Sequence, residues 1–100
     1  MAYKKINDGG VVELCYKSVT LQKSDHKEYL DIPNGSYKDV VTYVTHDIEV
    51  TLYGNNKDYL YATWEQDGYY YLIFGYLNDY FDDYRVTVDK FIEIDRTNKD

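Results

Sequence analysis

Apolar and polar residues alternate in several short segments of the chain, as they do in β-strands that bury one face. Within residues 11–17, the alternation places Val12, Leu14 and Tyr16 on one side. Residues 20–28 are polar, which predicts a loop or one exposed helical turn. The segments predicted as strands are 11–17, 40–44, 48–53, 59–64 and 69–74, with residues 29–32 as a candidate for a further short strand.

Turn-forming residues separate these segments. The predicted turns are Pro33–Ser36, His46-Asp47, Gly54–Asp58 and Gln66-Asp67-Gly68. The last is a strong hairpin signal, because Asp-Gly readily adopts the positive φ angles that a tight hairpin turn requires. The three strands from residue 48 to residue 74 are therefore predicted to form an antiparallel meander.

The same alternation predicts which side chains of the meander point into the core. They are Ile48, Val50, Leu52, Leu60, Ala62 and Trp64. Trp64 is the largest apolar residue of this set, so we expect it at the centre of the core.

The period of the apolar residues changes after residue 76. An apolar stripe with helical spacing follows, made of Leu77, Tyr80, Phe81, Tyr84, Val88, Phe91 and Ile92. Asn78 or Asp79 is suited to cap the start of this helix. Because Val86-Thr87-Val88 is poor helix material, the competing interpretation is a helix that ends near Tyr84 and a strand over Arg85–Ile94. The helix is favoured, and Asp95–Asp100 is expected to be a polar tail.

These elements predict an α+β fold: an antiparallel β-meander of about four to five strands, with one C-terminal helix packed on one face. The length of 100 residues is enough for one core. We therefore expect a single domain over residues 1–100, with flexible segments at 1–10 and 95–100.

Composition narrows the function classes. The formal charge of −7 disfavours direct binding to nucleic acid or to an anionic lipid surface. No apolar run approaches the roughly 20 residues that span a membrane, so no membrane insertion is expected. The 14 Tyr residues suit half-buried strands, and they also suit a contact surface for another protein.

No motif for catalysis, metal or cofactor binding emerges. His26 and His46 lie in polar contexts and are expected to be exposed. Cys15, the single cysteine, is expected to be a buried or half-buried thiol without a catalytic role. We therefore predict that the chain is not an enzyme and that it has no catalytic, metal-binding or cofactor-binding residues.

One segment combines acidic and aromatic residues. Between Asp58 and Tyr84 there are six acids, eight Tyr and the only Trp, and no Lys or Arg. One interpretation is a solvated rim of the sheet. The other is a contact surface for a protein partner with a basic surface. Its candidate partner-binding residues are Asp58, Glu65, Asp67, Tyr76, Asp79, Asp82 and Asp83.

Residues 48–54 (IEVTLYG) and 61–73 (YATWEQDGYYYLI) resemble a family of uncharacterised domains at the C-terminal, extracytoplasmic end of bacterial membrane-anchored and lipoprotein-type chains, some of them similar to anti-sigma regulators. The resemblance covers about residues 47–92. It implies a sensing or binding role and brings no catalytic residues. The chain departs from the family in showing no membrane anchor and in its longer, more β-branched final segment.

Two function classes follow. The first is a non-catalytic binding or sensory domain of a bacterial cell-surface type protein, which would be extracytoplasmic. The second is a small acidic inhibitor encoded by a phage or mobile element, which would act in the host cytoplasm. Such an inhibitor would imitate nucleic acid and bind a basic groove of a host nucleic-acid-handling or defence enzyme.

Overall fold

The computed structural model describes residues 3–5, 10–16, 18–32, 37–55, 58–75 and 84–97, without the side chains of Lys5, Asn55, Asp58 and Tyr59. Seven strands within these ranges form one antiparallel sheet. They are β1 (Lys4–Lys5), β2 (Val12–Tyr16), β3 (Val19–Ser24), β4 (Asp39–Thr45), β5 (Ile48–Asn55), β6 (Asp58–Gln66) and β7 (Tyr69–Gly75).

The spatial order of the strands is β1-β2-β3-β7-β6-β5-β4. The sheet therefore consists of two meanders, β1–β3 and β4–β7, that join where β3 pairs with β7. Gly75 ends this seam opposite Val19, and a Cβ at Gly75 would collide with the backbone of Ser18. The residue at this position must therefore be glycine for the two strands to meet as closely as they do.

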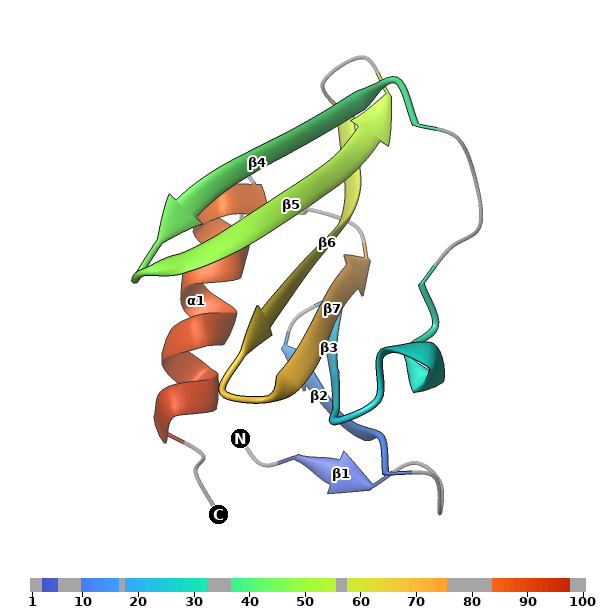
Figure 1. The fold of residues 1–100 in the computed structure, drawn as a ribbon, viewed down its shortest axis with the longest axis vertical. Coiled ribbons are helices and arrows are strands. Elements are labelled where there is room, and N and C mark those ends of the chain that lie inside the picture. The colour runs from blue at the N-terminus through green and yellow to red at the C-terminus, as the bar shows by residue number, and fades with distance from the viewer. Residues whose placement is uncertain are drawn as a thin grey trace.

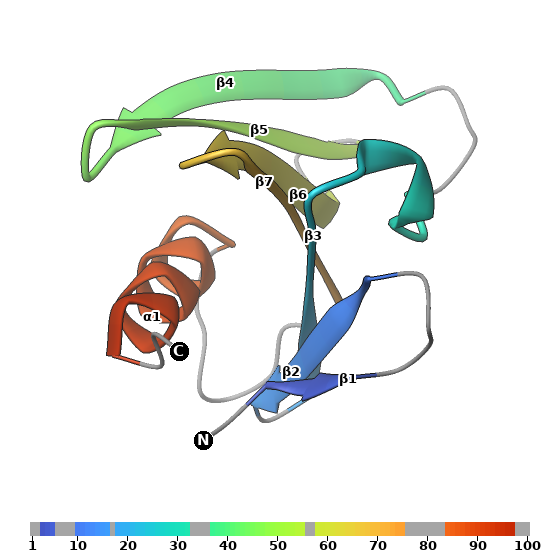
Figure 2. The ribbon, with the colours of Figure 1, turned by 60° about the horizontal axis from the view of Figure 1, so that its bottom comes forward.

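The sheet curls around a single described α-helix, α1 (Tyr84–Thr97) (Figure 1). In the second view α1 lies in the concave side, between β4-β5 and β1-β2 (Figure 2). A short 3₁₀ helix, η1 (Lys27–Tyr29), lies on the convex side. Within the described residues, no helix has both the length and the apolar character that crossing a bilayer demands.

The predicted fold class is confirmed: the fold is α+β, with an antiparallel, meander-like sheet and a C-terminal helix against it. The sheet has more strands than the four to five expected. The alternative strand over Arg85–Ile94 is wrong, because α1 continues through these residues to Thr97. The expected polar tail therefore does not begin at Asp95, which is buried on the helix.

Two expectations for the first half of the chain are also wrong. Residues 19–24 form β3 in the interior of the sheet, so the polar loop or helical turn expected over 20–28 is wrong for residues 20–24. Residues 25–28 do form an exposed bend and the start of η1. Residues 29–32 form no strand: Tyr29 is the last residue of η1, and residues 30–32 continue as an irregular segment. At the N-terminus, Lys4–Lys5 pair with β2, although residues 1–10 were expected to be flexible.

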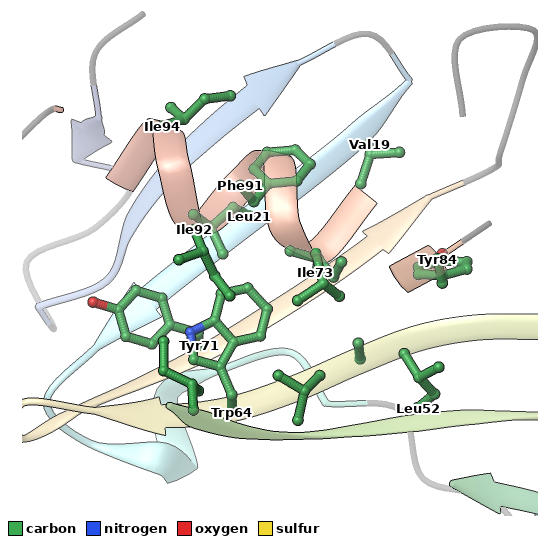
Figure 3. Packing of buried hydrophobic residues seen from close by; sticks show 14 of the residues in the cluster. Val19, Leu21, Leu52, Trp64, Tyr71, Ile73, Tyr84, Phe91, Ile92 and Ile94 are labelled. Carbon is green, nitrogen blue, oxygen red and sulfur yellow. The ribbon is translucent and has the colours of Figure 1, made fainter. Parts of the chain in front are cut away.

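The core lies between the concave face of the sheet and α1. Trp64 is 5% exposed, and its ring stacks on that of Tyr71 at a centroid distance of 5.1 Å. Figure 3 shows this pair facing Ile92 of the helix, with Phe91 and Leu21 behind. The expected position of Trp64 within the core is confirmed.

Leu60 does not join this core, although its strand alternation predicted that it would. It is 45% exposed, because a register shift in the β5–β6 ladder at Tyr53/Gly54 leaves Leu60 outside the paired residues. Such a bulge also leaves a backbone carbonyl outside the ladder. The hydroxyl of Tyr84, at the start of α1, lies 2.7 Å from the Leu60 carbonyl oxygen and 2.6 Å from that of Gly75, and donates to this carbonyl pair.

Two of the three predicted turns of the second meander are confirmed. The third, Gly54–Asp58, was predicted too long, because Gly54 and Asn55 belong to β5 and Asp58 belongs to β6. His46 and Asp47 both have positive φ angles, of 52° and 63°, between Thr45 and Ile48. Asp67 and Gly68 have φ angles of 55° and 82°, between Gln66 and Tyr69. These are the angles of two-residue hairpin turns that match the twist of the strands. The predicted turn at Pro33–Ser36 lies outside the described residues, as do the helix start at Asn78 or Asp79 and the first residues of the apolar stripe.

Candidate binding groove

The convex face of the sheet carries hydroxyl, aromatic and acidic side chains in an ordered arrangement. Because strand side chains alternate, every second residue of β5, β6 and β7 points to this face. The ladder aligns Thr51 with Thr63, and Tyr53 with Tyr61. Glu49 and Glu65 each lie one residue beyond the paired Val50 and Trp64. The face therefore passes from carboxylates through threonines to tyrosines along the strands.

Residues 25–32 cover part of this face, and a buried glutamine fastens them there. Gln22 of β3 is 1% exposed. Its Nε2 donates to Asp31 Oδ2 at 2.9 Å and to Glu13 Oε2 at 3.1 Å, while its Oε1 accepts from the backbone N–H of Asp31 at 3.0 Å. Leu30 packs beside it with Leu72 and Tyr61 in a small cluster separate from the main core. The segment is therefore held by both polar and apolar contacts.

A groove of about 320 Å³ lies between this segment and the strands. Its lining residues are Lys27, Leu30, Ile32, Glu49, Thr51, Tyr53, Thr63, Trp64, Glu65, Tyr70 and Tyr71. The rings of Trp64 and Tyr71 belong to the core on the other side of the sheet. The remaining lining side chains are those of the convex face and of the covering segment. From Glu49 to Tyr53 the strand spans roughly 13 Å, at about 3.3 Å a residue.

The two ends of the groove differ in chemistry. At one end the rings of Tyr53 and Tyr61 stack at a centroid distance of 4.5 Å, and Tyr37 meets Tyr61 edge-on at 5.4 Å. Burial, followed by the neighbouring Tyr37 and Tyr53, raises the pKa of Tyr61 above its ordinary value. At the other end lie the exposed carboxylates of Glu49 and Glu65. Lys27 is the one cation among the lining residues, so the lining carries a net negative charge.

The structure brings one of the predicted partner-binding residues, Glu65, into this groove. Asp67 lies exposed in the β6–β7 turn, two residues along the chain. Asp58 begins β6, but its side chain lies outside the described part of the chain. Four further predicted residues lie outside the described ranges, namely Tyr76, Asp79, Asp82 and Asp83.

Sequence reasoning missed most of the groove. Glu49, Thr51, Thr63 and Tyr70 share the convex face, and strand alternation could have shown that they do. The wall formed by residues 27–32 could not have been found in this way, because it depends on the tertiary contacts of Gln22.

The two histidines and the single cysteine lie at the surface. His26 and His46 are exposed, as expected. Cys15 is exposed, which corrects the expectation of a buried or half-buried thiol, and its Sγ lies 3.5 Å from Thr20 Oγ1. Among the residues that the structure describes, no cluster of three or more His, Cys, Asp or Glu side chains is placed to hold a metal ion.

Comparisons of the chain with protein-family models, with curated proteins and with solved structures gave no match. The groove is therefore interpreted from its own geometry and charge.

Proposed function

We propose that the chain is a non-catalytic binding domain whose convex-face groove holds a short basic segment of a partner protein. The observation that carries the proposal is the pairing of two carboxylates, Glu49 and Glu65, with a tyrosine stack at the other end of one groove. This proposal corresponds to the first of the two function classes expected from the sequence, a binding or sensory domain of a bacterial cell-surface type protein.

The groove suits an extended basic peptide in three respects. A Lys or Arg side chain between Glu49 and Glu65 would form charge-assisted hydrogen bonds with them. The hydroxyls of Thr51 and Thr63 can donate to or accept from a peptide backbone. A second cationic or aromatic side chain would find the exposed part of Tyr53 as a stacking surface. These contacts lie on neighbouring strands of one sheet, so their spacing is held by the backbone ladder.

The test uses short synthetic peptides as probes and NMR of the ¹⁵N-labelled chain. Penta-lysine and a lysine-tyrosine alternating peptide should shift the backbone amides of Glu49, Thr51, Thr63 and Glu65. Penta-glutamate should not. Because the attraction is between exposed charges, binding should weaken as salt shortens the Debye length to about 8 Å near 0.15 M.

Charge-removing variants locate the effect. Glu49→Gln with Glu65→Gln should reduce the affinity for penta-lysine at least several-fold. A matched control, Asp47→Asn with Glu93→Gln, removes the same charge from residues that do not line the groove. Equal losses in both double variants would mean that general electrostatics, and no specific site, attracts the peptide.

The second candidate is the acidic inhibitor of a nucleic-acid-handling enzyme. Four exposed acids favour it. They lie at the edge of the sheet where β5 begins and β6 ends, and they are Asp47, Glu49, Glu65 and Asp67. The test is a pull-down from a bacterial lysate at low and at high salt. Capture of a nucleic-acid enzyme that is released by high salt or by duplex DNA favours the inhibitor. Capture that survives both treatments contradicts it.

A further inference from the structure

Strand β4 has one edge that pairs with β5 and a second edge that pairs with no strand within the described residues. The register from Asp39 to Thr45 runs without a shift. Thr45 and Ile48 flank a two-residue turn, which makes them a hydrogen-bonded pair of the ladder. Since such pairs alternate along an antiparallel ladder, the N–H and C=O groups of Val40, Thr42 and Val44 point away from β5.

This edge lacks the usual protections. The opposite edge of the sheet, β1, consists of only two residues, and both are lysines. A short, charged edge of that kind resists pairing with another chain. By contrast, β4 has seven residues with neither Lys, Pro nor a bulge. Val40 and Val44 are 53% and 69% exposed, which leaves β-branched side chains in solvent beside backbone groups that no described strand pairs.

The sequence of β4 is self-complementary when it is laid antiparallel to itself about Thr42. Thr42 then meets Thr42 of the partner subunit, and Val40 meets Val44 of the partner subunit. On the other face, Val41 meets Tyr43 of the partner subunit. The one charged residue of the strand, Asp39, meets Thr45 of the partner subunit, so no like charges face each other directly. Cross-strand pairs of β-branched residues and of threonines stabilise antiparallel sheets.

We propose that β4 pairs with β4 of a second copy, antiparallel about Thr42, to form a two-fold dimer with a continuous sheet. The backbone groups that point away from β5 supply the hydrogen bonds, and each such pair of residues exchanges two of them. The groove lies over β5, β6 and β7, so the dimer leaves it open. The proposal is therefore independent of the proposed function.

The two associations should respond to salt in opposite directions. Each copy carries a formal charge of −7, so two copies repel each other at long range. Screening this repulsion should strengthen the dimer, whereas the same screening should weaken the binding of a basic peptide. Sedimentation velocity of the full chain should therefore show a dimer fraction that rises with protein concentration, and that rises between about 0.02 M and about 0.5 M salt.

Two variants test the edge. Val44→Lys places a charge at the dimer seam and should return the protein to monomer. Val86→Lys is the matched control, because Val86 is likewise an exposed valine, at 53%, but belongs to α1 and not to β4; it should leave the dimer unchanged. Far-UV circular dichroism with thermal melting checks that both variants fold.

A cross-linking experiment tests the register. In the Cys15→Ser background, Thr42→Cys should form a disulfide-linked dimer under mild oxidation, because directly opposed residues of a hydrogen-bonded pair have Cα atoms about 5.5 Å apart. Val86→Cys in the same background should not. A monomer at every concentration and salt, a dimer that persists in Val44→Lys, or equal cross-linking of the two cysteine variants would overturn the proposal.

Discussion

The concave face of the sheet packs against α1 with apolar side chains, whereas the convex face carries tyrosine, threonine and glutamate and is partly covered by residues 25–32. Both faces use tyrosine. On the concave face, buried Tyr71 donates its hydroxyl to Asp95 at 3.1 Å, and Tyr84 reaches two backbone carbonyls. On the convex face, Tyr53 and Tyr61 contact each other through their rings.

The difference teaches how one residue type can serve stability and recognition in the same sheet. A buried tyrosine hydroxyl must find a partner inside the protein, which ties distant elements together. A tyrosine beside a groove can keep its ring surface available to another molecule. We therefore expect changes on the concave face to act on folding, and changes on the convex face to act mainly on binding.

The largest effect is expected from Trp64→Ala, which empties the centre of the concave face. Truncation of a buried aromatic costs about 3–5 kcal/mol, out of roughly 5–15 kcal/mol for a whole domain. Urea unfolding followed by circular dichroism should show a large loss of stability. Leu60→Ala is the control on the same strand. Because Leu60 is 45% exposed, its loss should stay below about 1 kcal/mol. Similar losses in the two variants would contradict the assignment of the core.

The second-largest effect is expected from alkaline pH, which should lower the free energy of unfolding through the buried tyrosines of the concave face. Burial raises the pKa of Tyr84 to about 12, from about 10 in an unfolded chain. The folded protein then keeps a proton that the unfolded chain loses. The contribution of protonated Tyr84 to the free energy of unfolding is therefore complete below about pH 10 and is lost as the pH rises toward about 12. At about 1.4 kcal/mol per pKa unit, Tyr84 accounts for a loss of about 2–3 kcal/mol.

The measurement is the free energy of unfolding between about pH 8 and about pH 12. Tyr84→Phe should be less stable at neutral pH, because it leaves the carbonyls of Leu60 and Gly75 without their donor. Its stability should also fall less steeply with pH. Parallel pH curves for the wild type and Tyr84→Phe would exclude this role for Tyr84.

A smaller effect is expected from Gln22→Leu on the convex face. The change removes the amide that holds Asp31 and Glu13, at a cost of about 1–3 kcal/mol. Amide hydrogen exchange of residues 30–32 should accelerate more than that of β5 and β6, and the affinity for penta-lysine should fall. Gln66→Leu, near the end of β6, is the matched control. If residues 30–32 kept their protection, Gln22 would not be what holds the groove wall.

The smallest effect is expected from Cys15→Ser. The thiol is exposed on the convex face and lies outside the groove lining. The free energy of unfolding should change by no more than about 0.5 kcal/mol, and peptide binding should be unchanged. A lost affinity with the fold intact would assign the thiol a part in recognition.

The second meander could be predicted from the sequence because its residues obey simple alternation. Ile48, Val50 and Leu52 are all buried as predicted, and Asp67-Gly68 forms the predicted turn. Leu60 breaks the pattern, because the bulge shifts the register by one residue. Gly54 of β5 lies at this shift, but it was expected to begin the turn over residues 54–58.

Strand β3 could not be predicted in the same way. Gln22 and Ser24 are each 1% exposed, yet they give the segment a polar pattern. They are tolerated because their partners come from elsewhere in the fold: Gln22 bonds Asp31, and Ser24 Oγ accepts from the backbone N–H of His26. The groove could be predicted only in part, because its wall also depends on these tertiary contacts. Glu65 was identified from charge, but the wall that turns the convex face into a groove exists only because Gln22 is satisfied there.

The seam between β3 and β7 has a consequence for the order of folding. The ladders within β4–β7 join residues close in the chain, whereas the seam pairs Val19 with Gly75 and Ser24 with Tyr70. Closing so long a loop costs chain entropy before its contacts form, and non-local pairing of this kind slows folding. We expect the β4–β7 meander to form the folding nucleus and β1–β3 to dock onto it afterwards. Substitutions such as Leu52→Ala should therefore mainly slow folding, and Leu14→Ala should mainly speed unfolding.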